Sequence, residues 1–292
     1  MLSSGLRRFS QILTFIGVNL RDQLEIIIIN RSDYNINEPM FRNAIVIRPC
    51  ESIIDGLTSA ILGKPIYSLA IEQHSKYVET LEQLGLKVRT LPEKEMFPDS
   101  TFIEDVALCT RSCAIITRPA APSRRDEIDG IREVLEDYFN TIEKITFPAT
   151  LEAGDVMMVG SHYFIGISER TNSEGADQLI KILNKYKMTG SKVILKKMLH
   201  LKSGVSYLEN SNMLVSGEFI RSKEFERYNR IPIDKDESYA ANSLWINDKV
   251  IVPAGFPKSK RKIEKAGYET IALDVSEFRK IDGGLSCLSL RF

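Results

Sequence analysis

The sequence predicts an α/β fold in which five ββαβ-like modules surround a central axis. Its main support is a pattern of apolar strand, polar turn and second apolar strand, which recurs four times beyond residue 40. The four segments are 105–117, 155–167, 204–215 and 242–252, and they begin 50, 49 and 38 residues apart. Helical periodicity between the hairpins is the second support, because ββαβ modules need a crossover helix.

Turn residues mark the hairpins. Gly160–Ser161, Asn210–Asn212 and Asn247–Asp248 are residue types that tolerate positive φ and are typical of tight hairpin turns. In the first segment Cys109 and Cys113 flank the turn. We interpret these two cysteines as small apolar residues, since no histidine or second cysteine pair lies at metal-ligand spacing.

A fifth module requires two half-hairpins from opposite ends of the chain. Asn43–Arg48 and Cys287–Phe292 both have strand-like apolar runs, and their pairing would close the ring. Cys287 is predicted at the head of the last strand. It follows Gly283–Gly284, which allows a close backbone approach or positive φ.

Helical patterns occupy residues 65–84, 125–140, 176–186 and 258–266. Gly85 and Gly267 follow two of these patterns and act as stop signals. In such a ring the strand ends converge on a central channel, where we expect a small-molecule site.

Composition limits the functional classes. The chain has 292 residues, 43% of them hydrophobic, with 39 basic and 39 acidic side chains. This balance argues against a nucleic acid partner or an anionic membrane surface. Four irregularly spaced cysteines suit a reducing compartment, so we expect a cytoplasmic protein. The sequence does not specify an oligomeric state, and a homodimer is compatible with it.

Residues 1–39 differ from the rest. They combine two early arginines with short apolar runs, but they lack a small-residue cleavage site and a span of about 20 apolar residues. We interpret them as an N-terminal extension with little order and no stable membrane insertion. The catalytic domain is predicted to span residues 40–292.

Polar residues recur at the module entrances, the short segments directly before the first strand of each module. Glu104 and Asp105 stand before the first hairpin, Glu152 before the second, His200 before the third, and Cys287 before the closing strand. Taken singly, each has an ordinary explanation: a core cysteine, a core histidine or a solvated carboxylate. Their shared position instead indicates one site.

This set of residues suits a planar cationic substrate. Carboxylates grip a guanidinium through paired hydrogen bonds, and a cysteine thiolate attacks its electrophilic carbon. A histidine protonates the departing amine and then takes a proton from water. A nearby cation stabilises the thiolate.

The sequence resembles the bacterial dimethylarginine dimethylaminohydrolases of the pentein superfamily, which modify guanidino groups. The resemblance runs from Met40 to Phe292. It is carried by the motifs at 55–59, 72–74, 97–100, 103–105, 116–119, 152–155, 170–172, 199–202 and 282–287. It implies a five-bladed α/β propeller that needs neither cofactor nor metal.

The same resemblance implies roles for individual residues. Cys287 would be the nucleophile, His200 the general acid and base, and Glu152 the residue that orients His200. The implied substrate-binding residues are Leu57, Asp99, Glu104, Asp105, Arg124, Arg170 and Ile281. Among them, Arg124 and Arg170 would hold the α-carboxylate, and the carbonyls of Leu57 and Ile281 the α-amine.

The implied reaction is hydrolysis of Nω,Nω-dimethyl-L-arginine or the monomethyl form to citrulline and the methylated amine. It would proceed through an S-alkylthiouronium on Cys287. Two alternatives stay open at this point. One is an arginine deiminase-like hydrolase, although those enzymes usually carry a helical insertion. The other is a non-catalytic pentein that binds a partner, although such proteins lack the Cys and His pair.

We predict that a shortened chain beginning at Met40 folds and turns over substrate as well as the full chain. The physical reason is that residues 1–39 supply no module strand and none of the predicted site residues. Melting temperature and citrulline formation of both chains check this. An insoluble or inactive short chain would show that the extension belongs to the fold.

Overall fold

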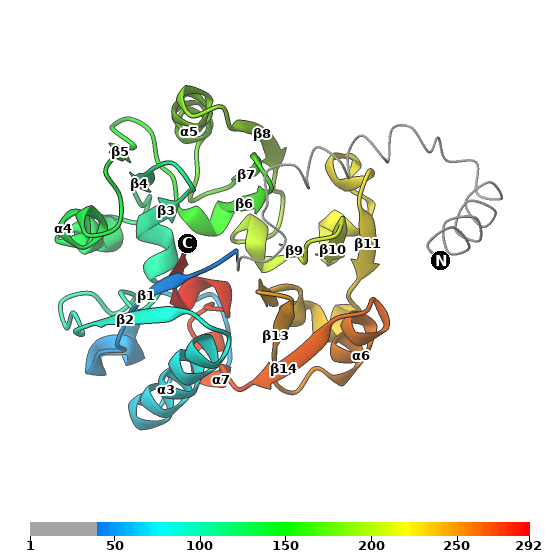
Figure 1. The fold of residues 1–292 in the computed structure, drawn as a ribbon. Coiled ribbons are helices and arrows are strands. Elements are labelled where there is room, and N and C mark those ends of the chain that lie inside the picture. The colour runs from blue at the N-terminus through cyan, green and yellow to red at the C-terminus, as the bar shows by residue number, and fades with distance from the viewer. Residues whose placement is uncertain (1–39) are drawn as a thin grey trace, which may run out of the picture. The chain divides into compact units, whose positions relative to one another are not determined.

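The computed structural model describes residues 40–292, and the predictions for residues 1–39 lie outside the described residues. Figure 1 shows the described part as a set of small sheets around a common centre, with helices on the periphery. Its strands form five separate three-stranded sheets, as the repeat pattern predicts.

The first two modules contain strands β1 to β5 and the C-terminal strand β15. The first consists of β1 (Asn43–Ile47), α3 (Tyr67–Gln83), β2 (Lys87–Leu91) and, from the C-terminus, β15 (Leu290–Arg291). The second consists of β3 (Ala107–Cys109), β4 (Ala114–Ile116), α4 (Ile131–Glu136) and β5 (Ile142–Lys144).

The other three modules follow in chain order. The third consists of β6 (Val156–Val159), β7 (His162–Ile167), α5 (Ser173–Lys185) and β8 (Thr189–Ile194). The fourth consists of β9 (Val205–Tyr207), β10 (Asn212–Val215) and β11 (Asn229–Pro232). The fifth consists of β12 (Leu244–Ile246), β13 (Lys249–Pro253), α6 (Pro257–Lys265) and β14 (Glu269–Leu273), and the short helix α7 (Ser276–Arg279) follows it.

Every module has the same topology. A central strand pairs antiparallel with one neighbour and parallel with the other, as β7 does with β6 and β8. The parallel pair needs a crossover connection, and a helix supplies it in four modules. In the fourth module two short 3₁₀ turns, Gly217–Arg221 and Lys223–Phe225, make the crossover, which explains why the sequence shows no helical pattern there.

The predicted ring closure is confirmed. β15 pairs antiparallel with β1, so that Ala44 lies opposite Arg291 and Ile45 opposite Leu290. Figure 1 shows the blue strand β1 beside the red C-terminal segment near the centre of the ring. The two ends of the described chain therefore share one sheet, and the last module cannot form without both.

Each first strand is preceded by a 3₁₀ turn rather than by an extended segment. These entrance turns are Ile103–Val106, Ala153–Asp155, Leu201–Ser203, Lys235–Ala241 and Ser286–Leu288. The prediction that Cys287 heads the last strand is therefore slightly wrong, because Cys287 lies in such a turn and the strand begins at Leu290. A strand would alternate successive side chains between two faces, whereas this turn places the consecutive residues Ser286 and Cys287 on the same cavity.

The core is divided into apolar clusters. One of them joins the amphipathic helix α3 to the fifth module, with Tyr77, Leu81, Ile251 and Phe278 fully buried. Tyr77 also donates a hydrogen bond from its hydroxyl to the carbonyl of Leu285, which fixes the segment before Cys287. Among the described residues, no helix is long and apolar enough to cross a membrane.

Candidate active site

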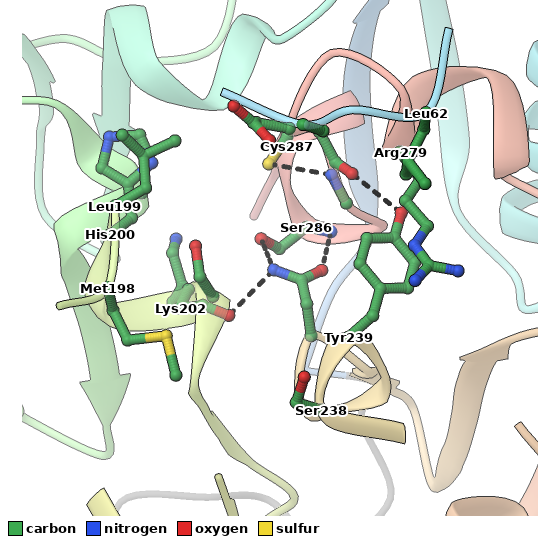
Figure 2. A pocket seen from close by; sticks show the side chains of 17 residues that line it. Leu62, Met198, Leu199, His200, Lys202, Ser238, Tyr239, Arg279, Ser286 and Cys287 are labelled. Atoms are coloured by element: carbon green, nitrogen blue, oxygen red, sulfur yellow. Dashed lines mark hydrogen bonds between the residues drawn. The ribbon is translucent and has the colours of Figure 1, made fainter. Parts of the chain in front are cut away.

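The entrance turns bring Cys287 and His200, two of the three predicted catalytic residues, to one cavity. It has a volume of about 310 Å³, within the range usual for small-molecule sites. Cys287 and His200 line it together with Lys202, Asn242 and Ser286. Figure 2 shows His200 and Cys287 on opposite sides of this space. The reacting part of a substrate can therefore lie between the thiol and the imidazole.

His200 is fixed at both its ring and its backbone. Its Nε2 lies 2.9 Å from Oε2 of Glu152, which is fully buried. The next residue, Leu201, donates its backbone N–H to Oδ1 of Asp155 at 2.9 Å. Asp155 in turn accepts a bond from the hydroxyl of Ser168. The sequence marks Asp155 only as the end of the Glu152 motif, and the structure shows that it anchors the histidine turn.

The carboxylates around His200 favour its protonated form. Burial alone would lower the pKa of this imidazole, but the nearby charges of Asp105, Asp155 and Glu152 outweigh that effect and raise the pKa to about 9. The imidazole is therefore cationic at neutral pH and can act first as an acid.

A glycine makes this arrangement possible. A Cβ on Gly154 would lie 2.8 Å from Nδ1 of His200 and 2.9 Å from Oδ1 of Asp105. The backbone N–H of Gly154 also donates a hydrogen bond to that Asp105 oxygen. Any side chain at this position would push the histidine away from the carboxylates.

Cys287 lies in a tightly packed turn. Its Sγ accepts a hydrogen bond from the backbone N–H of Gly284 at 3.4 Å. A Cβ on Gly283 would lie 2.2 Å from the Phe102 ring, and one on Gly284 would lie 2.6 Å from Oδ1 of Asn242. Of the two predicted reasons for the glycine pair, the structure supports close backbone approach.

The thiol itself is not activated in the free protein. Burial first, and then the negative charges of Glu104 and Asp105, raise the pKa of Cys287 to about 12. A cation bound beside these carboxylates would counteract part of this effect. The site is therefore arranged so that a positively charged substrate promotes ionisation of the thiol.

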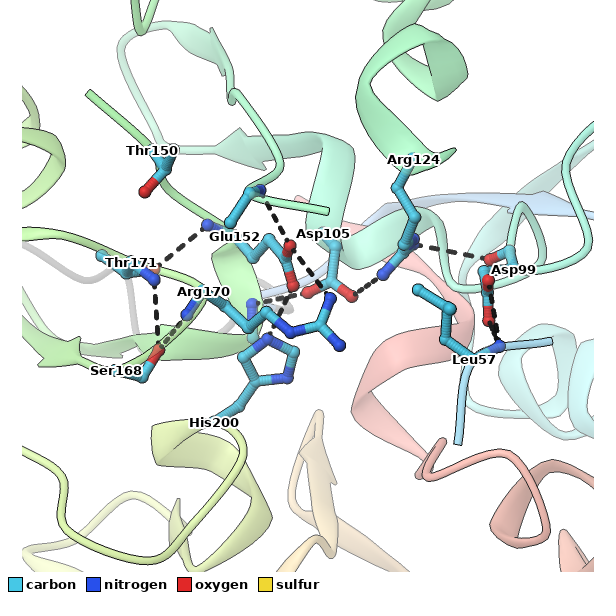
Figure 3. Close-up of polar contacts among 12 residues, drawn as sticks. Leu57, Asp99, Asp105, Arg124, Thr150, Glu152, Ser168, Arg170, Thr171 and His200 are labelled. Atoms are coloured by element: carbon cyan, nitrogen blue, oxygen red, sulfur yellow. Dashed lines mark hydrogen bonds and ion pairs between the residues drawn. The ribbon is translucent and has the colours of Figure 1, made fainter. Parts of the chain in front are cut away.

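Asp105 and Arg124 form a buried pair (Figure 3). Nη1 of Arg124 lies 2.7 Å from Oδ2 of Asp105, and the same guanidinium bonds the Glu127 carboxylate. Burial acts to raise the pKa of Asp105, but His200 and Arg124 hold it below its usual range. Asp105 therefore stays anionic.

The structure thus gives Arg124 partners that the sequence does not predict. Glu127, a buried residue one helical turn later, is visible in the sequence only as an i, i+3 charge pair. Burial raises the pKa of Glu127 to about 7, although Arg124 opposes this shift. The expected role of Arg124 in holding an α-carboxylate stays a prediction.

Arg170 is more accessible than Arg124. Its Nη1 lies 3.6 Å from Oε1 of Glu152, and 22% of its side chain is exposed. That combination leaves its guanidinium able to contact a ligand, so Arg170 is the better placed of the two arginines for a carboxylate clamp. The clamp itself is likewise a prediction.

Asp99 connects the predicted amine-binding region to the site. Its carboxylate accepts the backbone N–H of Leu57 at 3.0 Å, which fixes the loop that carries this residue. Asp99 is buried, and burial raises the pKa of its carboxyl. Leu57 is 40% exposed and Ile281 is buried. Their carbonyl contacts with an α-amine are not tested by these observations.

Glu104 has protein partners at both oxygens. Oε1 accepts bonds from Lys202 at 2.6 Å and Arg291 at 2.8 Å, and Oε2 accepts one from the hydroxyl of Ser286. Three elements remote in sequence therefore meet at this carboxylate. Its expected contact with a guanidinium stays a prediction, whereas its structural contacts are evident.

Asp105, Glu152 and His200 are the cluster of described residues that could hold a metal ion, with ligand atoms within 4.8 Å of one another. The four carboxylate oxygens are already engaged. Those of Asp105 bond Arg124 and Gly154, and those of Glu152 bond the Ala120 amide and His200. Each carboxylate oxygen of the cluster thus has a hydrogen-bond partner within the protein.

The fold and this site define the class of the protein. A ring of five ββαβ modules with a cysteine, a histidine and buried carboxylates at its centre is a pentein of the guanidino-modifying type. Comparison with known sequences narrows this further. The profile of the family described as "N,N dimethylarginine dimethylhydrolase, eukaryotic" matches residues 59–289.

The chain belongs to the dimethylarginine dimethylaminohydrolase family. It is 52% identical over 254 residues to the N(G),N(G)-dimethylarginine dimethylaminohydrolase of Pseudomonas aeruginosa, covering 87% of this chain and 100% of that relative. A cysteine-to-serine variant of the P. aeruginosa enzyme in complex with citrulline superposes with a TM-score of 0.86 at 52% identity, with the same coverage.

A second solved structure is equally similar. It is a dimethylarginine dimethylaminohydrolase with histidine replaced by glycine, an adduct with S-methyl-L-thiocitrulline. It matches with a TM-score of 0.85 at 52% identity and covers 87% of this chain and 100% of its own.

The raised thiol pKa leads to a prediction about reactivity. Without substrate, alkylation of Cys287 by iodoacetamide should be slow at pH 7 and should accelerate about tenfold per pH unit up to pH 9, because only the thiolate reacts. Mass spectrometry with Cys287→Ser as a control identifies the modified cysteine. A rate independent of pH across this range would show a thiolate already formed in the free protein.

Proposed function

We propose that this protein hydrolyses Nω,Nω-dimethyl-L-arginine, and the monomethyl form, to L-citrulline and the methylated amine. The observation that carries this proposal is the shared cavity of Cys287 and a protonated His200 beside two buried carboxylates. The 52% identical relative from P. aeruginosa is named as an N(G),N(G)-dimethylarginine dimethylaminohydrolase, which supports the same reaction.

Binding comes first in the proposed mechanism. The guanidinium lies against Asp105 and Glu152. Its positive charge offsets the nearby negative charges that disfavour the Cys287 thiolate. The thiol releases its proton to solvent, because His200 is already protonated, and Sγ attacks the guanidinium carbon. In this scheme substrate binding and nucleophile activation are one event.

Proton transfer by His200 completes both halves of the reaction. Glu152 occupies Nε2, so Nδ1 faces the reaction and donates its proton to the departing dimethylamine. The C–N bond breaks and leaves an S-alkylthiouronium on Cys287. The neutral imidazole then takes a proton from water, whose oxygen attacks the same carbon. The C–S bond breaks with its electron pair going to Sγ, the remaining hydroxyl proton passes to this thiolate, and citrulline is released with the Cys287 thiol restored.

A direct assay separates this proposal from the alternative of an arginine deiminase-like activity. Citrulline formation is measured with dimethylarginine, monomethylarginine and arginine side by side. Comparable or faster turnover of unmethylated arginine would favour the deiminase. Absence of citrulline from all three substrates would favour a non-catalytic binding module.

We further propose a cytoplasmic location and a small-molecule substrate as the principal ligand. All four cysteines are unpaired, which suits a reducing compartment. The even balance of charge argues against nucleic acid as a partner. A homodimer is compatible with these features, and sedimentation of the purified protein at two concentrations tests it.

The nucleophile is tested by Cys287→Ser, which should leave the melting temperature nearly unchanged and reduce turnover by several powers of ten. An alcohol is far less ionised than a thiol near neutral pH, although the two differ little in volume. Cys109→Ser, which changes a part-buried cysteine in β3, serves as the matched control and should keep full activity. More than about a tenth of wild-type activity in Cys287→Ser would contradict a covalent mechanism.

The carboxylate clamp is tested by Arg170→Ala. Loss of one charge-assisted pair should weaken transition-state binding of amino acid substrates by ~1.5–3 kcal/mol in kcat/KM. Agmatine-like guanidines, which lack the α-carboxylate, should show little change. Arg124→Ala should have the same selectivity but should also lower the melting temperature, because it leaves Asp105 and Glu127 buried without their partner.

The neighbouring exposed Arg125 provides a control, since Arg125→Ala should leave kcat/KM unchanged for both kinds of substrate. Equal losses for amino acid and agmatine-like substrates would show that the clamp has been misplaced.

A further inference from the structure

One module entrance has no role in the mechanism described above. The first three entrances and the closing one present Asp105, Glu152, His200 and Cys287. At the remaining one, Asn242 follows the turn Lys235–Ala241 and lies two residues before the start of β12. Asn242 is only 6% exposed and lines the active-site cavity.

The side chain of Asn242 connects the two catalytic segments. Its Nδ2 donates to the carbonyl oxygen of Lys202 at 2.9 Å, two residues after His200. The same nitrogen donates to Oγ of Ser286 at 3.0 Å, and Oδ1 accepts the backbone N–H of Ser286 at 3.0 Å. Ser286 immediately precedes Cys287. One amide thus holds the histidine turn and the cysteine turn at the same time.

A second set of bonds reinforces this connection. Ser286 donates its hydroxyl to Glu104, and Glu104 pairs with the ammonium of Lys202. Lys202, Asn242, Ser286 and Glu104 therefore form a closed loop of polar contacts across the ring. Figure 2 shows Lys202 and Ser286 on the two sides of the space that this amide bridges.

Packing leaves Asn242 little freedom. A Cβ on Gly284 would lie 2.6 Å from its Oδ1 and 3.1 Å from its Nδ2, so the backbone of the cysteine turn rests directly against the amide. Movement of this side chain would therefore displace the turn that carries the thiol.

We propose that Asn242 is a positioning residue that fixes the separation and orientation of His200 relative to Cys287. The proposal rests on the function proposed above, in which Cys287 attacks the guanidinium carbon and His200 protonates the nitrogen that leaves it. His200 must reach the departing nitrogen while Sγ is bonded to that carbon. A displacement of about 1 Å can cost about 10²-fold in rate. A rigid bridge between the two turns therefore maintains the rate by preventing such a displacement.

The test uses Asn242→Asp, which keeps the side-chain shape but removes both Nδ2 donors. Asn247→Asp is the matched control. Asn247 also donates twice through Nδ2, to the carbonyls of Phe41 and Leu84, and accepts the Phe41 N–H, but it does not line the active-site cavity. Asn242→Ala, which adds no charge, separates loss of the bridge from the effect of a new carboxylate.

Two substrates report on the position of His200. Dimethylarginine releases an amine that must be protonated as the C–N bond breaks. S-methyl-L-thiocitrulline gives the same S-alkylthiouronium when Sγ attacks its amidine carbon, but the broken bond is C–S and methanethiolate leaves with the electron pair, to be protonated by solvent. Its first half-reaction therefore depends much less on the imidazole.

We expect both Asn242 variants to lose about 10²-fold in kcat/KM for dimethylarginine, and no more than about fivefold for S-methyl-L-thiocitrulline. Asn247→Asp should lower the melting temperature at least as much as Asn242→Asp and keep the wild-type ratio of the two substrates. An equal loss on both substrates, or kcat/KM within about threefold of wild type for dimethylarginine, would overturn the proposal.

If Asn242→Asp does not fold, Asn242→Ala decides. If neither variant folds while Asn247→Asp does, Asn242 is a structural residue and the positioning role is wrong. The proposed function is judged separately on the unaltered chain. Wild-type protein that forms no citrulline from dimethylarginine contradicts the function, whereas a wild-type substrate ratio in the Asn242 variants contradicts only the positioning role.

Discussion

The pairing of β15 with β1 is the constraint on which the site depends. These strands come from opposite ends of the described chain, and their antiparallel register completes the first sheet. The turn that holds Cys287 ends two residues before β15, so its position is determined by this pairing. Pairing strands so far apart in sequence costs conformational entropy for loop closure, so the position of Cys287 depends on the packing of the whole ring.

A second constraint is electrostatic. Asp105, Glu152 and Asp155 are buried together, and isolated buried carboxylates would become neutral. Arg124, Arg170 and a protonated His200 supply the opposing charge. Burial acts to raise the pKa of Asp105, but His200 and Arg124 hold it below its ordinary value, so this carboxylate stays ionised for a cationic substrate. The raised pKa of the imidazole keeps His200 protonated as an acid. Burial, together with the negative charges of Glu104 and Asp105, raises the pKa of the cysteine thiol, which keeps it protonated until a cation binds.

The linkage of His200 to stability follows from the same charges. Its pKa in the folded protein, about 9, lies above the ordinary value of 6.5. The protonated imidazole therefore stabilises the fold fully below pH 6.5, and this contribution disappears as pH rises through about 9. The proposed acid function of His200 and its contribution to stability thus depend on the same proton, which carboxylates from two module entrances stabilise.

Sequence alone determined the module pattern and much of the chemistry. Alternating apolar residues and turn signals indicate hairpins, because strand periodicity and positive-φ turns are local properties. The closing pair could be inferred because four hairpins leave two unmatched strands, at 43–48 and 287–292. The positions of Cys287, His200 and Glu152 before strands indicated a common site. Only the tertiary structure decided which polar groups meet. Arg124 pairs with Asp105 and Glu127, and Glu104 pairs with Lys202 and Arg291. Asn242 bridges the turn after His200 and the turn that holds Cys287. These contacts join residues up to 187 positions apart, and their partners depend on how five modules close around an axis, which no local pattern encodes.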